Sequence, residues 1–497
     1  MGAAGAAGTA AAIAVPSPRR PWLALAAAVA LLALWRAWVA AGVPLSIDEA
    51  YYVAWSKTPD FGYWTKPPMI AWAIGAARAA CGESAGCVRM VPVLAFPLST
   101  LLLYALARRL SFGPWQACIA ALAFATMPMS SFYGIAATTD GLLLLCWIAA
   151  MLCLRMALDG HRGAWLATGL LAGLALLSKY SAAIFALSAA LALLHPQWRP
   201  WWRSRWPWLA AVVAVAVFAP NLGWNLAHGM PTFAHTAEIS EHGGYALNPK
   251  AMLEFLLAQF GVGGPVLFVA FIVWLWSRRW RMHPDGWFLL SFALPFLAVI
   301  SVQALLSRAN ANWAAPAMVA ISMAAMSMLL QRRPAWLSAS FAINLLLALL
   351  LYHFDVLVRE PFGLPHRVSS DPFWATRNWP GICEQVRAVA SRPPLPGAAV
   401  RLASDDRAAL AQLQAALALP PGAALGWQRG AKPANHFDQR FPLPLAPASP
   451  VLLVTAAPAD AVQAAFPRAQ AAGAVRSAVV ADRPLAFALW WILPPAN

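Results

Sequence analysis

Apolar stretches long enough to cross the roughly 30 Å hydrocarbon core of a membrane recur along the first 354 residues of this chain. Of its 497 residues, 61% are hydrophobic and 11% are charged, whereas an ordinary soluble domain has about 25% charged residues. We therefore predict an all-α polytopic membrane domain over residues 21–354, with about 11 and at most about 13 transmembrane helices. The stretches lie at residues 21–41, 88–107, 113–133, 138–157, 163–178, 180–195, 207–223, 251–276, 286–306, 313–331 and 335–354.

The pair of stretches at 163–178 and 180–195 is short, with only Lys179 and Tyr180 at the turn between them. A re-entrant hairpin there is an alternative to two full spans.

The basic residues test this topology, because cytoplasmic loops retain Lys and Arg while translocated loops do not. With the N-terminus in the cytoplasm, the segments on that side hold fourteen basic residues against two acidic ones, Asp159 and Asp285. About 12 of the 16 net positive charges are explained in this way. The high charge is thus a topology signal, and we expect no nucleic-acid partner.

The two ends of the chain differ from the apolar region. Residues 1–20 are low-complexity, and we expect a cytoplasmic N-terminus that leads into an uncleaved signal anchor. Residues 355–497 are more polar and rich in Pro and Ala, and the parity of the spans places them in the periplasm. Apolar runs predict strands at 398–404, 450–455 and 485–493, with helices at 405–417 and 459–466. A small extracytoplasmic α/β domain follows.

Two of the six cysteines, Cys81 and Cys87, fall in the same predicted external segment. A disulfide formed in an oxidising periplasm is one interpretation. Two unpaired thiols at the membrane interface are the other, and both stay open.

The first predicted external loop, residues 42–87, concentrates candidate functional residues. Asp48 and Glu49 directly follow the first span. Ionisable groups at membrane depth are costly, so they usually line a cavity or pair with another group. The loop is also rich in aromatic residues, for which an interfacial belt is the simpler interpretation. We assign Asp48 a functional role in preference to capping.

A second acidic position, Asp140, begins the fourth span, where a carboxylate would also cap the helix. Lys66, Lys179 and Arg308 are cations in or beside the outer half of the membrane. Together they would bind an anionic headgroup, because phosphate prefers Lys and Arg donors at close range. Any one of them alone could be a snorkelling side chain.

Six short segments occur in an order that resembles a known family. They resemble the GT-C glycosyltransferases that use polyprenyl-phosphate-linked sugars, close to the lipid A aminoarabinose transferases and more distantly the protein O-mannosyltransferases. Each segment is short, but six in order over nearly the whole chain, with a matching topology, are more specific. The segments are SIDEAYY, GYWTKPPMIAW, TTDGLLLL, GLALLSKYSA, NLGWNLAHGMPTF and NANWAAPA.

The resemblance implies an inverting glycosyltransferase on the outer face of the bacterial inner membrane. Its donor would be a polyprenyl-phosphate-linked sugar, and its acceptor an envelope molecule such as lipid A, another lipid, a glycan or a protein. A carboxylate can deprotonate or orient an acceptor hydroxyl, and cations can stabilise charge on a departing phosphate. An acceptor that is itself a phosphate would need only orientation. The sugar and the acceptor stay open, with hexose, galacturonate and pentose donors all considered.

The resemblance also assigns roles to residues. Asp48 and Asp140 take the family's two acidic positions, with Glu49 as a further catalytic candidate. Lys66 matches the family lysine that faces the carrier phosphate, and Lys179 and Arg308 are expected to join it. The expected lining of the substrate cavity is Tyr51, Tyr63, Trp64, His228 and Asn312.

No cofactor is certain, and a divalent metal stays open. Thr65 stands where the family often has an acidic residue or a second polar ligand, which weakens any metal site carried over. The predicted external loop 224–250 offers His235, Glu238 and His242, which would share one helical face. A polar interfacial segment that contacts a lipid headgroup or the acceptor is the simpler interpretation.

Two other functional classes compete with a transferase. A transporter or lipid-carrier flippase would also be polytopic and carry charges at membrane depth. Transporters, however, tend to have internal repeats with symmetrically interrupted helices, and no such halves are evident. A noncatalytic scaffold would leave the constellation of Asp48, Asp140 and Lys66 unexplained.

Overall fold

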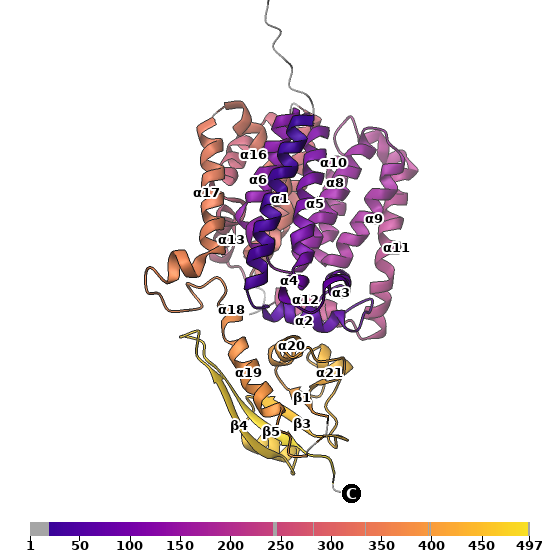
Figure 1. Cartoon of the computed structure of the whole chain (residues 1–497). Helices are drawn as coiled ribbons and strands as arrows, with labels where there is room; N and C mark the ends of the chain where they lie inside the picture. Colours follow the sequence, from indigo (N-terminus) through magenta and orange to yellow (C-terminus); the bar gives the residue numbers. More distant parts are fainter. Residues whose placement is uncertain are drawn as a thin grey trace, which may run out of the picture.

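The computed structural model describes residues 19–241, 246–281, 283–332, 334–395, 397 and 399–495. Almost all of the predicted N-terminal segment, residues 1–20, lies outside this range. Helices up to Tyr352 form a bundle, and the chain from Asp355 onward forms a C-terminal unit below one end of it (Figure 1). We call that end of the bundle the docked end.

Within the described chain, seven helical segments are long and apolar enough to cross a membrane. This confirms a mostly helical chain with several membrane spans, whereas the number of about 11 stays a prediction. The seven are α1 (Arg19–Gly42), α4 with α5 (Ala85–Val88, Met90–Arg109), α8 (Thr139–Leu158), α11 (Arg205–Ala227), α15 (Pro284–Leu306), η4 with α16 (Ala311–Ala314, Ala315–Arg332) and α17 (Pro334–Tyr352).

An eighth segment is broken. The continuous span predicted at 251–276 is wrong, because α13 (Pro249–Gly263) and α14 (Pro265–Trp276) meet at an angle of 114°. Pro265 lacks an amide hydrogen and restricts the residue before it, so a straight helix cannot continue. Gly264 has a φ of 87°, and a Cβ there would lie 2.5 Å from Asn344 Oδ1 of α17. Only glycine fits this corner without strain.

The remaining helices of the bundle are shorter. The predicted span 180–195 is a 3-10 turn followed by a nine-residue helix, together about 20 Å long, which is too short to cross the hydrocarbon core alone. The elements are α2 (Ile47–Ser56), α3 (Met69–Cys81), α6 (Pro114–Thr126), α7 (Pro128–Tyr133), α9 (Gly163–Ser178), η1 (Tyr180–Ala183), α10 (Ile184–Ala192), η2 (Arg199–Arg203), α12 (Pro231–Ser240) and η3 (Arg279–Arg281).

Burial separates central spans from peripheral ones. The most apolar window of α16 is 72% buried within the protein, while that of α11 is only 17% buried. Around the centre, Trp147 of α8 packs edge-on against Phe185, Phe292 and Phe296. The exposed leucines and valines of α11 form a lipid-facing surface, as in a helix at the edge of a membrane bundle.

Small residues bring α9 and α11 into close contact. Gly169 and Gly173 lie four residues apart on one face of α9. A Cβ on Gly173 would lie 2.7 Å from Val217 Cβ and 2.9 Å from Ala214 O of α11. This is the small-residue packing by which membrane helices approach each other without a hydrophobic driving force.

The C-terminal unit contains a five-stranded mixed sheet in the order β2-β1-β3-β5-β4. β1 pairs in parallel with β2 and β3, and β5 pairs antiparallel with β3 and β4. All five segments predicted here form the expected elements. The elements are η5 (Asp355–Arg359), α18 (Trp374–Arg377), α19 (Trp379–Ala390), β1 (Arg401–Ser404), α20 (Arg407–Ala416), β2 (Ala424–Gly426), α21 (His436–Arg440), β3 (Val451–Thr455), α22 (Ala459–Ala465), β4 (Gln470–Ser477) and β5 (Leu485–Ile492).

Alternation along the strands gives the sheet two apolar faces, because successive side chains point to opposite sides. On one face, Leu452 and Leu489 pack with Ile382 of α19 and Leu413 of α20. On the other face, Leu453 packs with residues of α22. Helices therefore cover both sides of the sheet.

A shared hydrophobic core joins the C-terminal unit to the docked end. Tyr51 and Trp55 of α2 pack in one buried cluster with Leu410 of α20 and Phe437 of α21. Gln412 Nε2 donates a hydrogen bond to Leu45 O at 3.0 Å. Figure 1 shows α20 and α21 directly beneath α2. The unit is thus packed against the bundle rather than tethered loosely to it.

The cysteine question is resolved in favour of pairing. Cys81 and Cys87 form a disulfide, with their Cα atoms 5.8 Å apart. It links the end of α3 to α4 at the docked end.

Candidate active site

A cavity of about 890 Å³ opens at the docked end of the bundle. Its wall combines the start of α2, the loop before α3, the start of α8, the break between α9 and η1, α12, and the end of α15. Another part of the wall comes from the segment around α18 of the C-terminal unit, through Pro372, Phe373, Ala375 and Thr376. Of the predicted site residues, the lining includes Asp48, Glu49, Lys66, Asp140, Lys179, Arg308 and Asn312.

Asp48 is presented by the first turn of α2. Ser46 caps this helix through a capping box: its hydroxyl accepts from Glu49 N, and the Glu49 side chain accepts from Ser46 N. The Asp48 side chain is 63% exposed, and Arg407 Nη2 of α20 lies 3.8 Å from its Oδ1. An ionised carboxylate held this loosely is free to accept a hydrogen bond or a proton from a substrate.

Asp140 lies in the first turn of α8, where the helix dipole favours a negative charge. Lys179 Nζ donates a hydrogen bond to Asp140 Oδ1 at 2.9 Å. Asp140 is 4% exposed, and its Oδ2 makes no hydrogen bond with any residue that the structure describes. One oxygen is thus anchored by Lys179, and the residue lines the cavity.

Lys179 owes its position to a break in the helix. Its backbone is extended, with φ −161° and ψ 132°, between the end of α9 and the 3-10 turn η1. The next residue, Tyr180, is held by two asparagines of α11: its hydroxyl donates to Asn221 Oδ1 at 2.8 Å and accepts from Asn225 Nδ2 at 3.1 Å. Through Tyr180, α11 fixes the segment that carries Lys179.

Lys66 is a cation without a counterion. It lies in the loop between α2 and α3, lines the cavity, and makes no hydrogen bond or ion pair with any described residue. Burial lowers the pKa of its amine, the positive charge of Lys179 lowers it further, and Asp48 and Asp140 oppose the shift. A half-buried cation of this kind gains from an anionic ligand, because the ligand replaces the water that burial removed.

Arg308 and Asn312 complete the polar wall. Arg308 follows α15, is exposed toward the cavity, and its guanidinium likewise has no partner among the described residues. Asn312 lies in η4, at the start of α16. Lys66 and Arg308 are therefore the two lining cations that are open to a substrate.

Glu49 does not have the environment expected of a reacting carboxylate. It is 1% exposed, and its two oxygens accept from Arg89 Nε and Nη2, each at 2.7 Å, from Ser46 N at 2.8 Å, and from Ala137 N at 2.8 Å. Burial alone would raise the pKa of Glu49, but the charge and hydrogen bonds of Arg89 and the two backbone donors lower it. These four hydrogen bonds occupy both oxygens of the Glu49 carboxylate. We therefore interpret Glu49 as a structural residue that stabilises the segments around it.

Arg89, which the sequence reasoning missed, is the centre of that structure. Its Nη1 donates to Ala40 O at 2.8 Å and to Val43 O, and its Nη2 also donates to Pro44 O at 2.9 Å. The Glu49 and Arg89 pair thereby ties the end of α1 to α2, α5 and the segment before α8. The sequence did contain a sign of its importance. Arg89 is a basic residue at the outer end of a predicted span, where topology predicts few.

Four residues expected to line the cavity do not line it. Tyr51 is fully buried against the C-terminal unit, and its hydroxyl accepts from His436 N at 2.7 Å. Tyr63 stacks on Trp55 at 4.8 Å, and His228 stacks on Trp224 at 4.3 Å. Trp64 is half-buried outside the lining. The aromatic residue of this loop that does reach the cavity is Tyr52.

The structure offers no support for the metal site. His235 Nδ1 lies 3.8 Å from Glu238 Oε2 on α12, and His242 lies outside the described residues. Among the described residues, no group of three or more His, Cys, Asp or Glu side chains is arranged to hold a metal. Thr65, at the position where the related family often has an acid, lines the cavity with a hydroxyl rather than a carboxylate.

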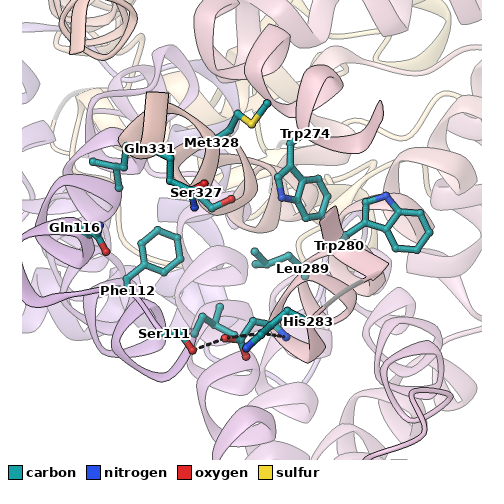
Figure 2. Close-up of a pocket in the computed structure, with 14 residues that line it drawn as sticks. Ser111, Phe112, Gln116, Trp274, Trp280, His283, Leu289, Ser327, Met328 and Gln331 are labelled. Carbon is teal, nitrogen blue, oxygen red and sulfur yellow. Dashed lines mark hydrogen bonds and ion pairs between the residues drawn. The ribbon is translucent and has the colours of Figure 1, made fainter. Parts of the chain in front are cut away.

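A second cavity, of about 260 Å³, lies at the opposite end of the bundle (Figure 2). Its acidic residue, Asp285, accepts from Ser111 Oγ at 2.7 Å and from Arg155 Nη2 at 3.0 Å. The residues labelled in Figure 2 mix apolar side chains such as Phe112, Trp274 and Leu289 with polar ones such as Gln116 and Ser327. The described residues that line it include no lysine or arginine. We therefore take the larger cavity as the candidate active site.

Comparison with known proteins places this architecture in context. The family model for dolichyl-phosphate-mannose-protein mannosyltransferases matches residues 65–224. The lipid A galacturonosyltransferase RgtD of Rhizobium johnstonii is 32% identical over 415 residues, which cover 82% of this chain and 85% of that protein.

Two further proteins are similar over a shorter stretch or in fold. An undecaprenyl phosphate-alpha-4-amino-4-deoxy-L-arabinose arabinosyl transferase of Pseudomonas paraeruginosa is 33% identical over 170 residues, 33% of this chain and 31% of its own length. The crystal structure of ArnT from Cupriavidus metallidurans bound to undecaprenyl phosphate superposes with a TM-score of 0.67 at 16% identity, covering 96% of this chain and 99% of that one. At that identity the likeness concerns the fold.

Proposed function

The chain belongs to the GT-C family of membrane glycosyltransferases, and we propose that it transfers a uronic acid, galacturonic acid, from a polyprenyl-phosphate carrier to a lipid A-type acceptor. The proposal has two supports. One is the galacturonosyltransferase relative, which this chain matches over most of both lengths. The other is the charge arrangement of the cavity at the docked end.

The observation that carries the proposal is the pattern of paired and unpaired charges. Arg89 neutralises Glu49, and Lys179 neutralises Asp140. Asp48, the third acidic residue of the lining, lies 3.8 Å from Arg407. Lys66 and Arg308 line the same cavity with no partner among the described residues. An uncompensated pair of cations in a largely apolar cavity is the environment that an amphipathic, twice-negative ligand would complement.

This charge pattern separates the candidate sugars. A polyprenyl-phosphate uronate has two negative charges, one on the phosphodiester and one on the sugar carboxylate. An aminopentose donor has the same phosphate but carries a positive amine, and a neutral hexose has nothing to match the second cation. Two open cations therefore favour the uronate. Arginine forms bidentate hydrogen bonds to carboxylates, which suits Arg308 to the sugar and Lys66 to the phosphate.

The proposed reaction is a single displacement with inversion. The acceptor oxygen attacks the anomeric carbon from the face opposite the carrier, and the bond from that carbon to the phosphate oxygen breaks. The phosphate departs with the bonding electrons, and Lys66 stabilises the charge that grows on it. When the acceptor is a hydroxyl, Asp48 takes its proton. When the acceptor is a phosphate, Asp48 and the free oxygen of Asp140 orient it.

The site would work on the outer face of the bacterial inner membrane. Clustered basic residues such as Arg108, Arg109 and Arg155 lie at the opposite end of the bundle, where retention in the cytoplasm is expected. A disulfide between Cys81 and Cys87 at the docked end suits an oxidising compartment. On this orientation the C-terminal unit is periplasmic and the N-terminus is cytoplasmic.

The test supplies purified protein with a lipid A acceptor and three donors on the same carrier: galacturonate, aminoarabinose and a neutral hexose. Release of free polyprenyl phosphate and the mass of the acceptor are followed together. We expect transfer from the galacturonate donor, and its loss in Asp48→Asn and Asp140→Asn, each of which removes a charge at nearly constant shape. Preference for the aminoarabinose donor would overturn the sugar assignment. Turnover at the wild-type level in both variants would overturn the site.

A further inference from the structure

The C-terminal unit delivers a charged side chain to the candidate active site. α20 packs on α2 through the shared core of Tyr51, Trp55 and Leu410. Asp406 caps α20, its Oδ1 accepting from Ala408 N at 2.6 Å and from Ala409 N at 3.2 Å. The first residue after this cap is Arg407. The rigid start of α20 therefore points at the start of α2, where Asp48 lies.

Arg407 sits where its own helix does not favour it. The helix dipole makes a positive charge in the first turn unfavourable. The contacts that Arg407 makes must therefore offset this unfavourable interaction. Its guanidinium carbon lies 4.9 Å from the centre of the Tyr51 ring, and its Nη2 lies 3.8 Å from Asp48 Oδ1. Among the described residues, no other cation lies within 4 Å of the Asp48 carboxylate.

We propose that Arg407 is a positioning residue for Asp48, so that the active site is incomplete without the C-terminal unit. This inference rests on the proposed role of Asp48 in transfer. The aromatic face of Tyr51 holds the guanidinium, and its positive charge attracts one carboxylate oxygen of Asp48 at 3.8 Å. The second oxygen is left to meet the acceptor.

The arrangement gives Asp48 a charged partner and still leaves it exposed. Its side chain is 63% exposed, so packing alone does not select one rotamer. A charge fixed by cation–π contact on a buried ring restricts the carboxylate without covering it. Lys66 and Lys179 do not take part in this contact. Lys66 is left to bind the phosphate, and Lys179 is paired with Asp140.

The test compares two substitutions that separate charge from packing. Arg407→Met retains an apolar stem over Tyr51 but removes the charge, and Arg407→Lys retains the charge. The matched control is Arg429→Met, because Arg429 makes the same two kinds of contact within the C-terminal unit: an ion pair with Asp405 at 3.2 Å and a guanidinium 5.5 Å from the Trp427 ring. Wild type and Asp48→Asn are measured beside them.

The expected result is a split between kcat and KM. In Arg407→Met, kcat should fall roughly tenfold with donor KM unchanged, because displacing a reacting group by about 1 Å can cost up to 10²-fold. Arg407→Lys should recover most of kcat, and Arg429→Met should match wild type. Thermal unfolding of all the variants should agree with wild type, which shows that the unit stays docked.

Two results would overturn the inference. A normal kcat in folded Arg407→Met would show that the contact is packing alone, and a raised donor KM at unchanged kcat would show that Arg407 binds substrate instead of positioning Asp48. Failure of the proposed function is a separate result: wild type would then transfer none of the sugars, or Asp48→Asn would be fully active.

Discussion

At the residue scale, the charge of Lys66 predicts how the binding of polyprenyl phosphate depends on pH. Burial and the neighbouring Lys179 lower the pKa of Lys66 below its usual 10.5. The charged form is therefore lost at a lower pH than for a free lysine. If protonated Lys66 binds the carrier phosphate, affinity for polyprenyl phosphate should fall as the pH rises toward that lowered pKa.

Lys66→Arg provides the comparison, because a guanidinium stays charged throughout this range. Binding of polyprenyl phosphate measured between about pH 7 and pH 10 should decline in wild type and stay nearly constant in Lys66→Arg. Parallel declines in the two proteins would show that another group titrates.

For Glu49 we predict an effect on stability rather than on ligand binding. Glu49→Gln leaves Arg89 buried without a negative partner, which should cost about 3–5 kcal/mol. Apparent melting in detergent should therefore fall strongly in Glu49→Gln and little in Asp48→Asn. Equal melting of the two variants would contradict the structural role.

The pH dependence of this pair has a definite sign. The pKa of Glu49 is lower in the folded protein than its usual 4.5. Its contribution to stability is therefore complete above that usual value, and it is lost as the pH falls through the lower pKa of the folded state.

At the element scale, the contact between α9 and α11 determines where Lys179 lies. Gly173→Leu would drive a side chain into Val217 and Ala214 of α11, and overpacking of this kind typically costs about 1–3 kcal/mol. We expect lower thermal stability and weaker transfer, because α11 holds Tyr180 beside Lys179. Gly223→Leu is the control, since Gly223 of α11 has open space around it. Indistinguishable melting of the two variants would contradict the close packing of α9 and α11.

The elements differ in how well the sequence predicts them. Long apolar runs such as those of α8 and α15 are recognisable because length and hydropathy suffice to identify a span. The break between α13 and α14 is not found by hydropathy, because the apolar run continues through Gly264. Its signal is local, a glycine followed by Pro265, and such pairs are tolerated in other membrane helices.

At the scale of the whole molecule, the proposed orientation has a direct chemical test. Ser391 is exposed at the end of α19 in the C-terminal unit, and Arg162 is exposed at the opposite end of the bundle. A membrane-impermeant maleimide applied to cells with a permeable outer membrane should label Ser391→Cys at once. It should label Arg162→Cys only after the inner membrane is opened. The reverse pattern would invert the topology.

The sequence predicts cavity-lining residues best where the signal lies within one local segment. Asp48, Lys66 and Asp140 stand out because charge is rare at membrane depth, and all three line the cavity. Arg407 was not predicted, because it reaches Asp48 only through the packing of α20 on α2, across more than 350 residues of chain. The prediction that Tyr51 and Tyr63 line the cavity was wrong for a related reason. The sequence does not show that the C-terminal unit packs over these two residues.

The most direct test of the central claim is the mass of the lipid A acceptor after incubation with purified protein and polyprenyl-phosphate galacturonate. We expect an acceptor heavier by one uronosyl residue, free polyprenyl phosphate in equal amount, and neither product with Asp48→Asn. An unchanged acceptor in the presence of folded wild-type protein, or equal product from Asp48→Asn, would contradict the proposed transfer.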